Sequence, residues 1–410
     1  MAEHGHDPHF ALTQCRREFG EHGGVSPSTG RSSTFTVMDS STMPEIFAGL
    51  RGPDKGGCFL YSRHFNPTVD VLARYLAAME GTEFAACTAS GMAAISTAIL
   101  QICHAGDHVV ASDTVYGGTR ALLNDLLPSM GITTTFVDPS DTAAFEAALT
   151  PETKVFYTEV VANPTLKVAD IPALSTLAKA HGVTLIADNT FTPMVMSPAK
   201  LGADIVVYSL TKFVGGASDF IAGAICASRD FVQKLFDLHT GRIMLFGPTM
   251  DPRVAIDLIM RLPHLGLRMQ EHGRRALAMA ERLDELGVDV TYPGLKRHPH
   301  HDLLVALANE GYGFGGMFTI DCKTTEKAMA FMDHLQNEDE FGLMAVSLGY
   351  YDTLLSCSST STSSEIPVED QHTMGLSPGL VRISVGYTGT LEQRMEQLVS
   401  GVRALGLTTR

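Results

Sequence analysis

The sequence contains no tryptophan, and aromatic residues make up only 7% of its 410 positions. It has no apolar run near the roughly 18 residues that a membrane-spanning helix needs, so a membrane protein is not expected. Basic residues are few, because 30 Lys and Arg stand against 45 Asp and Glu, a formal net charge of −15. No basic stripe with interleaved aromatic residues is present. Since binding to nucleic acid requires clustered cations, no nucleic-acid partner is expected.

Paired cysteines and targeting segments are also missing. The seven cysteines are an odd number, and none belongs to a C-x-x-C pair. This pattern disfavours both a zinc site and a disulfide framework. The N-terminal residues have neither the basic-then-apolar order of a secretory signal nor the Arg- and Ser-rich composition of a transit peptide. We therefore expect reduced thiols and a cytoplasmic protein.

What the sequence does contain is a regular alternation of strand-like and helix-like segments. Short apolar runs predict strands, and apolar residues at helical spacing predict the helices between them. The predicted strands are 83–88, 107–112, 133–137, 154–160, 183–187 and 203–208, and the predicted helices are 91–103, 118–127, 143–149 and 173–181. This alternation is typical of an α/β protein with a mostly parallel, doubly wound sheet.

The pattern of apolar and polar residues divides the chain into three parts. Residues 1–60 have no clean periodicity and are expected to be disordered or to form an arm packed on something else. Residues 61–265 form the predicted large domain. A long helical tract over 253–286 should be divided at Pro263, and residues 266–410 are expected to form a smaller α+β domain.

The residues that carry chemistry are expected where strands end, since ligands bind outside the carboxyl ends of the strands in an open α/β sheet. Lys212 follows one such strand in the run SLTK and precedes a glycine-rich turn. A lysine against apolar walls has a lowered pKa and a nucleophilic amine, as imine formation requires. The alternative is a surface lysine in an ordinary loop.

Asp188 ends the preceding apolar strand, 24 positions before Lys212. A carboxylate there needs a cationic partner, which a protonated pyridine nitrogen or a structural salt bridge would supply. Asp188 and Lys212 together predict a pyridoxal phosphate (PLP) site.

Other strand ends supply further candidates. Gly91 and Met92 begin a helix whose free N–H groups could bind phosphate, although Ser90 could simply be its N-cap. Tyr116 could lie flat on a planar ring, or be an ordinary turn tyrosine. Glu159 and Asn163 end another strand, where the Asn163 amide could bond a phenolic oxygen, although Asn-Pro is also a common turn.

Two motifs are not taken as binding sites. The run GYGFGG at 311–316 satisfies G-x-G-x-x-G, but a strand-like segment follows it where a nucleotide-binding loop needs a helix. A glycine-rich hairpin or bulge is expected instead. His298, His300 and His301 could ligate a metal, but adjacent histidines in a polar loop are more often solvated, so no metal is expected.

Several segments in order resemble the Cys/Met-metabolism family of fold-type I PLP enzymes over nearly the whole chain. The segments that carry this resemblance are YSRHFNPT (61–68), SGMAAI (90–95), YGGT (116–119), DNTF (188–191), SLTK (209–212), SLG (347–349) and VRISVG (381–386). Within the family, EFGEHGG (18–24), FGLMAVSLGYY (341–351) and LLSCS (354–358) are similar to the plant-type methionine gamma-lyases. The resemblance implies an aspartate-aminotransferase-like fold and PLP as the cofactor.

The resemblance also implies a role for each matching residue. Lys212 would hold the cofactor and move protons, Asp188 would pair with the ring nitrogen, and Tyr116 would stack on the ring and assist leaving-group departure. The phosphate would be bound by Gly91, Met92, Ser209 and Thr211, and by Tyr61 and Arg63 of a neighbouring subunit, which implies a homo-oligomer, expected as a tetramer of two dimers. Arg382 would bind the carboxylate of an amino-acid substrate beside Ser347.

The activity that the resemblance implies is cleavage of L-methionine to methanethiol, 2-oxobutanoate and ammonia. Gly118 stands where bacterial methionine gamma-lyases have a cysteine, and GASD at 216–219 and GYTG at 386–389 replace commoner family runs. Cystathionine gamma- or beta-lyase, cystathionine gamma-synthase and O-acetylhomoserine sulfhydrylase activities therefore stay open. Outside the family, a nicotinamide-binding dehydrogenase or a non-catalytic scaffold are the alternatives.

Overall fold

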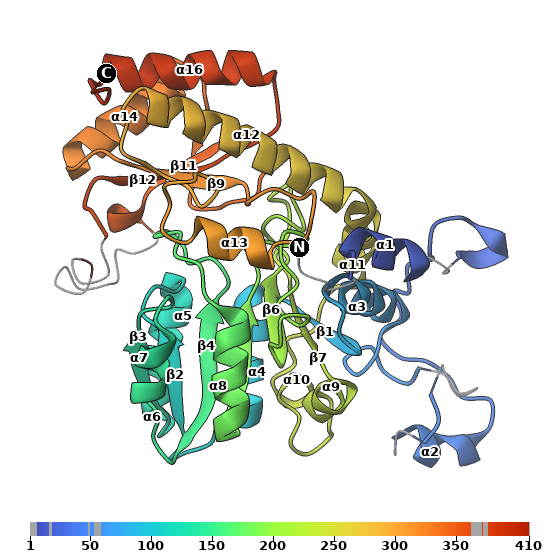
Figure 1. Ribbon diagram of the computed structural model, residues 1–410. Coiled ribbons are helices and arrows are strands. Elements are labelled where there is room, and N and C mark those ends of the chain that lie inside the picture. The colour runs from blue at the N-terminus through green and yellow to red at the C-terminus, as the bar shows by residue number, and fades with distance from the viewer. Residues whose placement is uncertain are drawn as a thin grey trace.

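The computed structural model describes residues 6–15, 19–47, 50–52, 59–361, 371 and 376–409. Its strands form a seven-stranded sheet and a separate five-stranded sheet (Figure 1). The structure is therefore of the α/β class. The segments that the sequence predicts as strands are strands in the structure.

The large sheet has the strand order β1-β7-β6-β5-β4-β2-β3. Its strands are β1 (Phe84–Thr88), β2 (His108–Ser112), β3 (Thr133–Val137), β4 (Thr153–Glu159), β5 (Thr184–Asp188), β6 (Ile205–Ser209) and β7 (Gly223–Ala227). Strands β3, β2, β4, β5 and β6 pair in parallel, whereas β7 is antiparallel to both β6 and β1. Strand β1 thus runs in the same direction as β6, and the carboxyl ends of β1 to β6 lie along one edge of this sheet. The sequence did not predict β7.

Successive strand residues point to opposite faces of the sheet and build two cores. In β6, Val206 and Tyr208 pack in one core, and Ile205 and Val207 pack in the other. The first face is covered by α3 (Pro67–Glu80), α7 (Thr142–Ala147), α8 (Ile171–His181) and α11 (Pro252–Arg261). The second face is covered by α4 (Gly91–Ile102), α5 (Gly117–Ala121), the π-helical η4 (Leu122–Leu126), α6 (Leu127–Ser129), α9 (Arg229–Leu235) and α10 (Arg242–Phe246). The sheet is doubly wound, as predicted.

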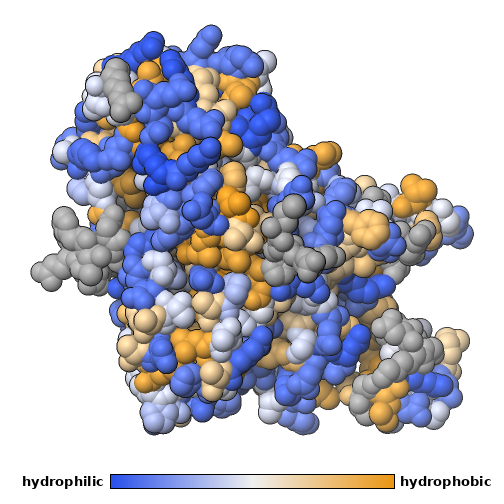
Figure 2. All heavy atoms as spheres, viewed as in Figure 1, coloured by the Kyte–Doolittle hydropathy of each residue, from blue (hydrophilic) through white to orange (hydrophobic). Residues whose placement is uncertain are grey.

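The small sheet has the order β10-β11-β12-β9-β8. Its strands are β8 (Val290–Thr291), β9 (Met317–Asp321), β10 (Leu343–Met344), β11 (Leu354–Cys357) and β12 (Leu380–Ser384), followed after β11 by the short η6 (Ser358–Thr360). Helices α12 (Leu265–Glu285), α14 (Thr325–Asn337) and α16 (Leu391–Ala404) cover one face of it (Figure 1). Helix α13 (His301–Leu307) lies between the two sheets, and apolar residues gather over it on the face that Figure 2 shows.

The helical tract predicted over 253–286 is interrupted at the proline. Helix α11 ends at Arg261, the 3-10 turn η5 (Leu262–His264) contains Pro263, and α12 begins at Leu265. Proline lacks the N–H that a continuous helix needs at this position, which explains the break. The predicted domain boundary near 265 falls at the start of α12, between the two sheets.

The N-terminal segment contains more regular structure than its sequence pattern indicates. It forms α1 (Pro8–Cys15), η1 (Glu21–Gly23), η2 (Ser40–Thr42) and α2 (Met43–Phe47). Helix α1 packs on α3 through Leu12, which is buried. Helix α3 begins at Pro67, because the Asn66 side chain caps its first turn.

The two motifs set aside in the sequence have structural roles here. Gly311, Gly313 and Gly315 all have positive φ in a turn that packs against α12, and the strand β9 follows them. The predicted histidine loop is partly the helix α13, and His300 Nδ1 accepts a hydrogen bond from Val168 N. Among the described residues, no cluster of metal-ligating side chains is found, and no helix is long and apolar enough to cross a membrane. The Ser/Thr-rich run 356–364 is described only to residue 361; its last three residues lie outside the described part.

Candidate active site

The edge formed by the carboxyl ends of the strands brings most of the predicted residues together. Lys212 lies just after β6, and its Nζ donates a hydrogen bond of 3.1 Å to Ser347 Oγ in the loop between β10 and β11. Burial, and secondarily the charge of Arg382, lower the pKa of Lys212 to about 8. The lysine is therefore half-buried between the two sheets and ready to act as a nucleophile.

Asp188, at the end of β5, is buried and has no ion-pair partner among the described residues. Its carboxylate accepts hydrogen bonds from Tyr157 Oη at 3.2 Å and from Thr190 N at 2.9 Å. Burial raises the pKa of Asp188, since nothing cationic compensates its charge. The salt bridge considered for Asp188 is thus absent from the described part of the chain, and a cationic ligand atom would stabilise this carboxylate.

Glu159, at the end of β4, is held by backbone groups of two loops. Its two carboxylate oxygens accept hydrogen bonds from Tyr116 N at 2.6 Å and Asn163 N at 3.0 Å. Glu159 therefore holds the two loops that carry Tyr116 and Asn163. Burial and the nearby charge of Asp188 raise the pKa of Glu159. A second buried acid at this edge adds to the need for a cationic group.

Arg382, in the middle of β12, provides a buried positive charge from the small sheet. Its side chain is 2% exposed, and it donates to Ser347 O at 2.9 Å and to Asn163 Oδ1 at 3.2 Å. Burial lowers the pKa of Arg382 to about 10. No described carboxylate forms an ion pair with it, so the guanidinium has the properties of a site for an anionic group of a ligand. The Asn163 amide bonds this arginine here, a partner that the sequence did not suggest.

The N-terminus of α4 is open to an anion. Ser90 caps Ala93 N, and the N–H groups of Gly91 and Met92 have no partner within the helix. A Cβ on Gly91 would lie 2.6 Å from Ser209 Cβ, so glycine permits close approach of α4 to the end of β6. Ser209 therefore stands beside two free N–H groups, as a phosphate site requires. The Thr211 hydroxyl accepts a hydrogen bond from Ala222 N at 3.0 Å and donates one to Ala222 O at 3.3 Å.

Tyr116 is 45% exposed and caps α5, with its ring beside Gly118 and Met92. A Cβ on Gly118 would lie 2.6 Å from Tyr116 Cε1. A side chain at position 118 would therefore displace this ring.

Tyr61 and Arg63 are not brought to this group in the single chain. Tyr61 forms an isolated bridge with Thr34, and Arg63 Nη1 donates to Met244 O at 3.1 Å, beside α10. Neither hydrogen-bonds Lys212, Ser209 or Gly91 among the described residues.

The structure adds residues that the sequence did not single out. Tyr157 is fully buried in β4, and its hydroxyl is the hydrogen-bond partner of Asp188. A tyrosine in a buried strand needs a polar partner for its hydroxyl, which was the available signal. Arg268 of α12 donates to Phe213 O at 2.5 Å and Val214 O at 2.8 Å, directly after Lys212. Arg268 is one of several charged residues in α12, so the sequence pattern gives no sign of its role.

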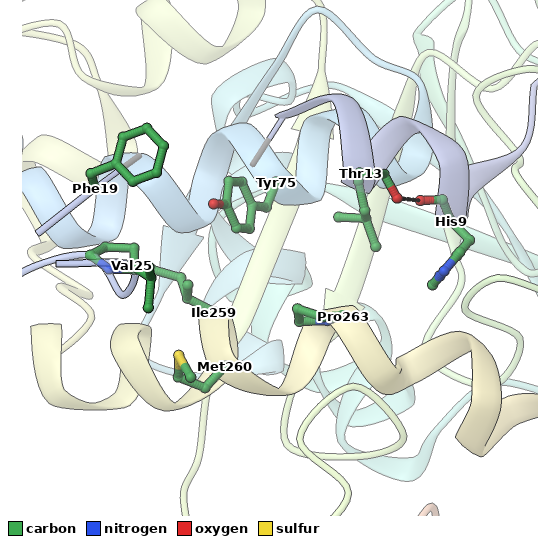
Figure 3. Close-up of a pocket in the computed structure, with 10 residues that line it drawn as sticks. His9, Thr13, Phe19, Val25, Tyr75, Ile259, Met260 and Pro263 are labelled. Atoms are coloured by element: carbon green, nitrogen blue, oxygen red, sulfur yellow. Dashed lines mark hydrogen bonds between the residues drawn. The ribbon is translucent and has the colours of Figure 1, made fainter. Parts of the chain in front are cut away.

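A separate cavity of about 370 Å³ lies between α1, α3 and α11 (Figure 3). His9, Tyr75 and Met260 are among the residues that line it, and none of the predicted site residues does. The candidate active site is the edge around Lys212 and not this cavity.

Comparison with known proteins agrees with this geometry. Residues 11–396 match the model of the Cys/Met metabolism PLP-dependent enzyme family. The chain belongs to this family. PLP is accordingly its cofactor, and the free N–H groups at α4, the unpaired Asp188 carboxylate and the desolvated Lys212 amine fit its phosphate, ring nitrogen and aldehyde.

Individual relatives cover nearly the whole chain. The chain is 56% identical over 393 residues to methionine gamma-lyase of Arabidopsis thaliana, covering 95% of this chain and 89% of the relative. It is 38% identical to cystathionine gamma-lyase of Bacillus subtilis, covering 89% and 93%. A crystal structure from Campylobacter jejuni that carries an N'-pyridoxyl-lysine-5'-monophosphate residue superimposes with a TM-score of 0.89 at 25% identity, covering 97% of this chain and 100% of that one. The fold is thus that of fold-type I PLP enzymes.

Proposed function

We propose that this protein is an L-methionine gamma-lyase, which converts methionine and water to methanethiol, 2-oxobutanoate and ammonia. The observation that carries the choice of substrate is the 56% identity to a methionine gamma-lyase over 95% of the chain. The reaction class is supported by the arrangement of Lys212, Asp188 and Arg382 between the two sheets.

Each residue has a task that follows from its surroundings. When bound, PLP withdraws electrons from the substrate and so eases removal of protons from Cα and Cβ. Lys212 Nζ holds the cofactor and then moves protons between the substrate carbons, for which its lowered pKa is suited. Asp188 keeps the ring nitrogen protonated. The Arg382 guanidinium binds the substrate carboxylate beside Ser347.

The remaining residues orient the ligand. The N–H groups of Gly91 and Met92 and the Ser209 hydroxyl would bind the phosphate, and the Thr211 hydroxyl would join them by giving up its bond to Ala222 O. Tyr116, held through its backbone by Glu159, stacks on the ring and donates a proton to the departing thiolate. Asn163 is held by the other oxygen of Glu159 and supports Arg382.

The function is tested by identifying products with methionine as the sole substrate. Formation of methanethiol and 2-oxobutanoate in equal amounts is the expected result. The competing candidate is a cystathionine lyase, which is favoured by the 38% identity to cystathionine gamma-lyase of Bacillus subtilis. If kcat/KM for methionine is lower than for cystathionine, cysteine or O-acetylhomoserine, the proposed substrate is wrong.

The pH dependence of cofactor uptake follows from the lysine. Only the neutral amine reacts with an aldehyde, and the pKa of Lys212 is lowered to about 8. The rate at which the apoprotein takes up PLP into a borohydride-reducible linkage is therefore expected to rise from pH 7 to pH 9, with its midpoint near 8. Stopped-flow absorbance measures it. A rate that still rises in proportion to hydroxide above pH 9 would mean an ordinary solvated lysine.

We also propose that Tyr61 and Arg63 reach the phosphate of a neighbouring subunit in a cytoplasmic homotetramer of two dimers. Arg63 is then expected to act in trans. Co-expression of Lys212→Ala and Arg63→Ala chains with different tags, followed by tandem purification of the mixed dimer, should recover about half of the wild-type activity, since one of two sites is intact. If Arg63 acts within its own chain, every site carries a lesion and no activity is recovered.

A further inference from the structure

Glu80, the last residue of α3, is a buried acid that the proposed reaction does not use. Its side chain is 1% exposed, and it accepts hydrogen bonds from the Tyr208 hydroxyl and, at 2.9 Å, from Ala199 N. The charged and titratable groups near it are Lys200, Cys226 and Tyr208. Among the described residues Glu80 has no ion-pair partner, and burial raises its pKa to about 7. Burying a carboxyl group without a cationic partner costs free energy of folding. The hydrogen bonds that hold Glu80 in this place therefore point to a role for it.

The network continues from Tyr208 to Asn189. Asn189 Nδ2 donates to Tyr208 Oη at 2.8 Å and to Met196 O at 3.0 Å, and Asn189 Oδ1 accepts from Thr192 Oγ1 at 2.6 Å. All four side chains of this network, Glu80, Tyr208, Asn189 and Thr192, are buried.

The position of the network relative to the site is set by the alternation of strand residues. Asn189 follows Asp188 directly, and Tyr208 precedes Ser209 directly. Tyr208 belongs to the core on the α3 face, whereas Tyr157, the partner of Asp188, belongs to the core on the α4 face. The network therefore lies on the opposite face of the sheet, immediately behind Asp188 and Ser209.

The network also begins where the backbone ladder ends. The last residue pair of β5 and β6 is Asp188 with Val207. Beyond it, the two chains are joined by Asn189 N to Val207 O at 3.0 Å, by Ser209 N to Thr190 Oγ1 at 2.8 Å, and by the side-chain bond from Asn189 to Tyr208. The last of these is the only one of the three that joins two side chains.

We propose that Tyr208, held by Glu80 and Asn189, is a positioning residue that sets the separation of the β5 and β6 ends, and thereby aligns Asp188 with Lys212. This inference rests on the proposed roles of these two residues. Because a misplacement of about 1 Å can lower a rate about 100-fold, a partial loosening should have a measurable effect.

The test is Tyr208→Phe in the full-length protein, with Tyr292→Phe as the matched control. Tyr292 is equally buried and donates its hydroxyl proton to Gly315 O at 2.8 Å, but it follows β8 and packs in the core of the small sheet. Tyr208→Phe is expected to raise the dissociation constant of PLP from the apoprotein about tenfold, and to lower kcat about tenfold with KM for methionine within a factor of two. The visible absorbance band of the bound cofactor should also titrate at a different pH. Tyr292→Phe should change none of these.

A milder pair of variants covers the case in which Tyr208→Phe does not fold. Thr192→Val removes the bond that orients the Asn189 amide, and Thr192→Ser retains it. Thr192→Val should then weaken PLP binding, whereas Thr192→Ser should bind PLP as the wild type does. The inference is overturned if both tyrosine variants change PLP binding equally, or if the network variants lower Tm alone. If the wild-type protein binds PLP but does not cleave methionine, the proposed substrate is wrong. The comparison of PLP binding between the variants still tests the positioning role of Tyr208.

Discussion

Replacement of Lys212 by alanine is expected to lower kcat for methionine cleavage by at least about 10³-fold, because it removes the amine proposed to hold the cofactor and to move protons at the substrate. Lys212→Arg should be equally inactive, since a guanidinium keeps the charge but is not a nucleophile at neutral pH. Peptide mass analysis after borohydride reduction should find the pyridoxyl group on Lys212 in the wild type and on no peptide of either variant.

The control for this experiment is Lys234→Ala. Lys234 is exposed and forms an ion pair of 2.7 Å with Asp230, an interaction of small energetic value. This variant should retain wild-type activity and wild-type labelling. If Lys212→Ala keeps more than a tenth of the activity, or if the label lies on another lysine, the assignment of the active site is wrong.

The second large effect is expected at Arg382. Arg382→Lys keeps a positive charge but cannot bond a carboxylate with two parallel N–H groups, so kcat/KM for methionine should fall about 100-fold, or about 2.7 kcal/mol. The decisive measurement uses the amine analogue of methionine that lacks the carboxylate. Its binding, measured by the change in cofactor absorbance, should be weak and nearly equal in the wild type and the variant.

Arg275→Lys is the matched control for Arg382→Lys. Arg275 is also a buried arginine. It forms an ion pair of 2.6 Å with Glu271, and its guanidinium donates to Thr388 O and Gly389 O in the loop after β12. The control should lose stability without a comparable loss of kcat/KM. If the two variants lose kcat/KM equally, or if Arg382→Lys weakens the amine analogue as much as methionine, Arg382 acts through folding and not through the substrate carboxylate.

These two residues define the electrostatic character of the site. Lys212 and Arg382 are desolvated cations on one side, and Asp188 and Glu159 are buried acids on the other. The arrangement leaves both sets incompletely compensated within the chain. A zwitterionic cofactor and an amino-acid substrate would supply the missing opposite charges, which is a physical reason for the proposed binding between the two sheets.

The sequence alone determined the local elements and the residues at their ends. Alternation of apolar runs and helical spacing located β1 to β6, and the missing N–H of Pro263 located the break between α11 and α12. The order of short motifs was sufficient to place Asp188 and Lys212 at neighbouring strand ends. These features depend on residues that are close in the chain, and so they are visible as patterns.

Only the tertiary structure decided which distant groups meet. Arg382 and Asn163 are 219 positions apart, and Lys212 and Ser347 are 135 apart, so no local pattern relates them. The antiparallel β7, the Tyr157 bond to Asp188 and the burial of Glu80 likewise depend on which face and which neighbour the packed sheet provides. The spacing of residues fixes where a side chain lies on its own helix or strand. Its burial and its hydrogen-bond partners are decided only when the helices and strands pack together.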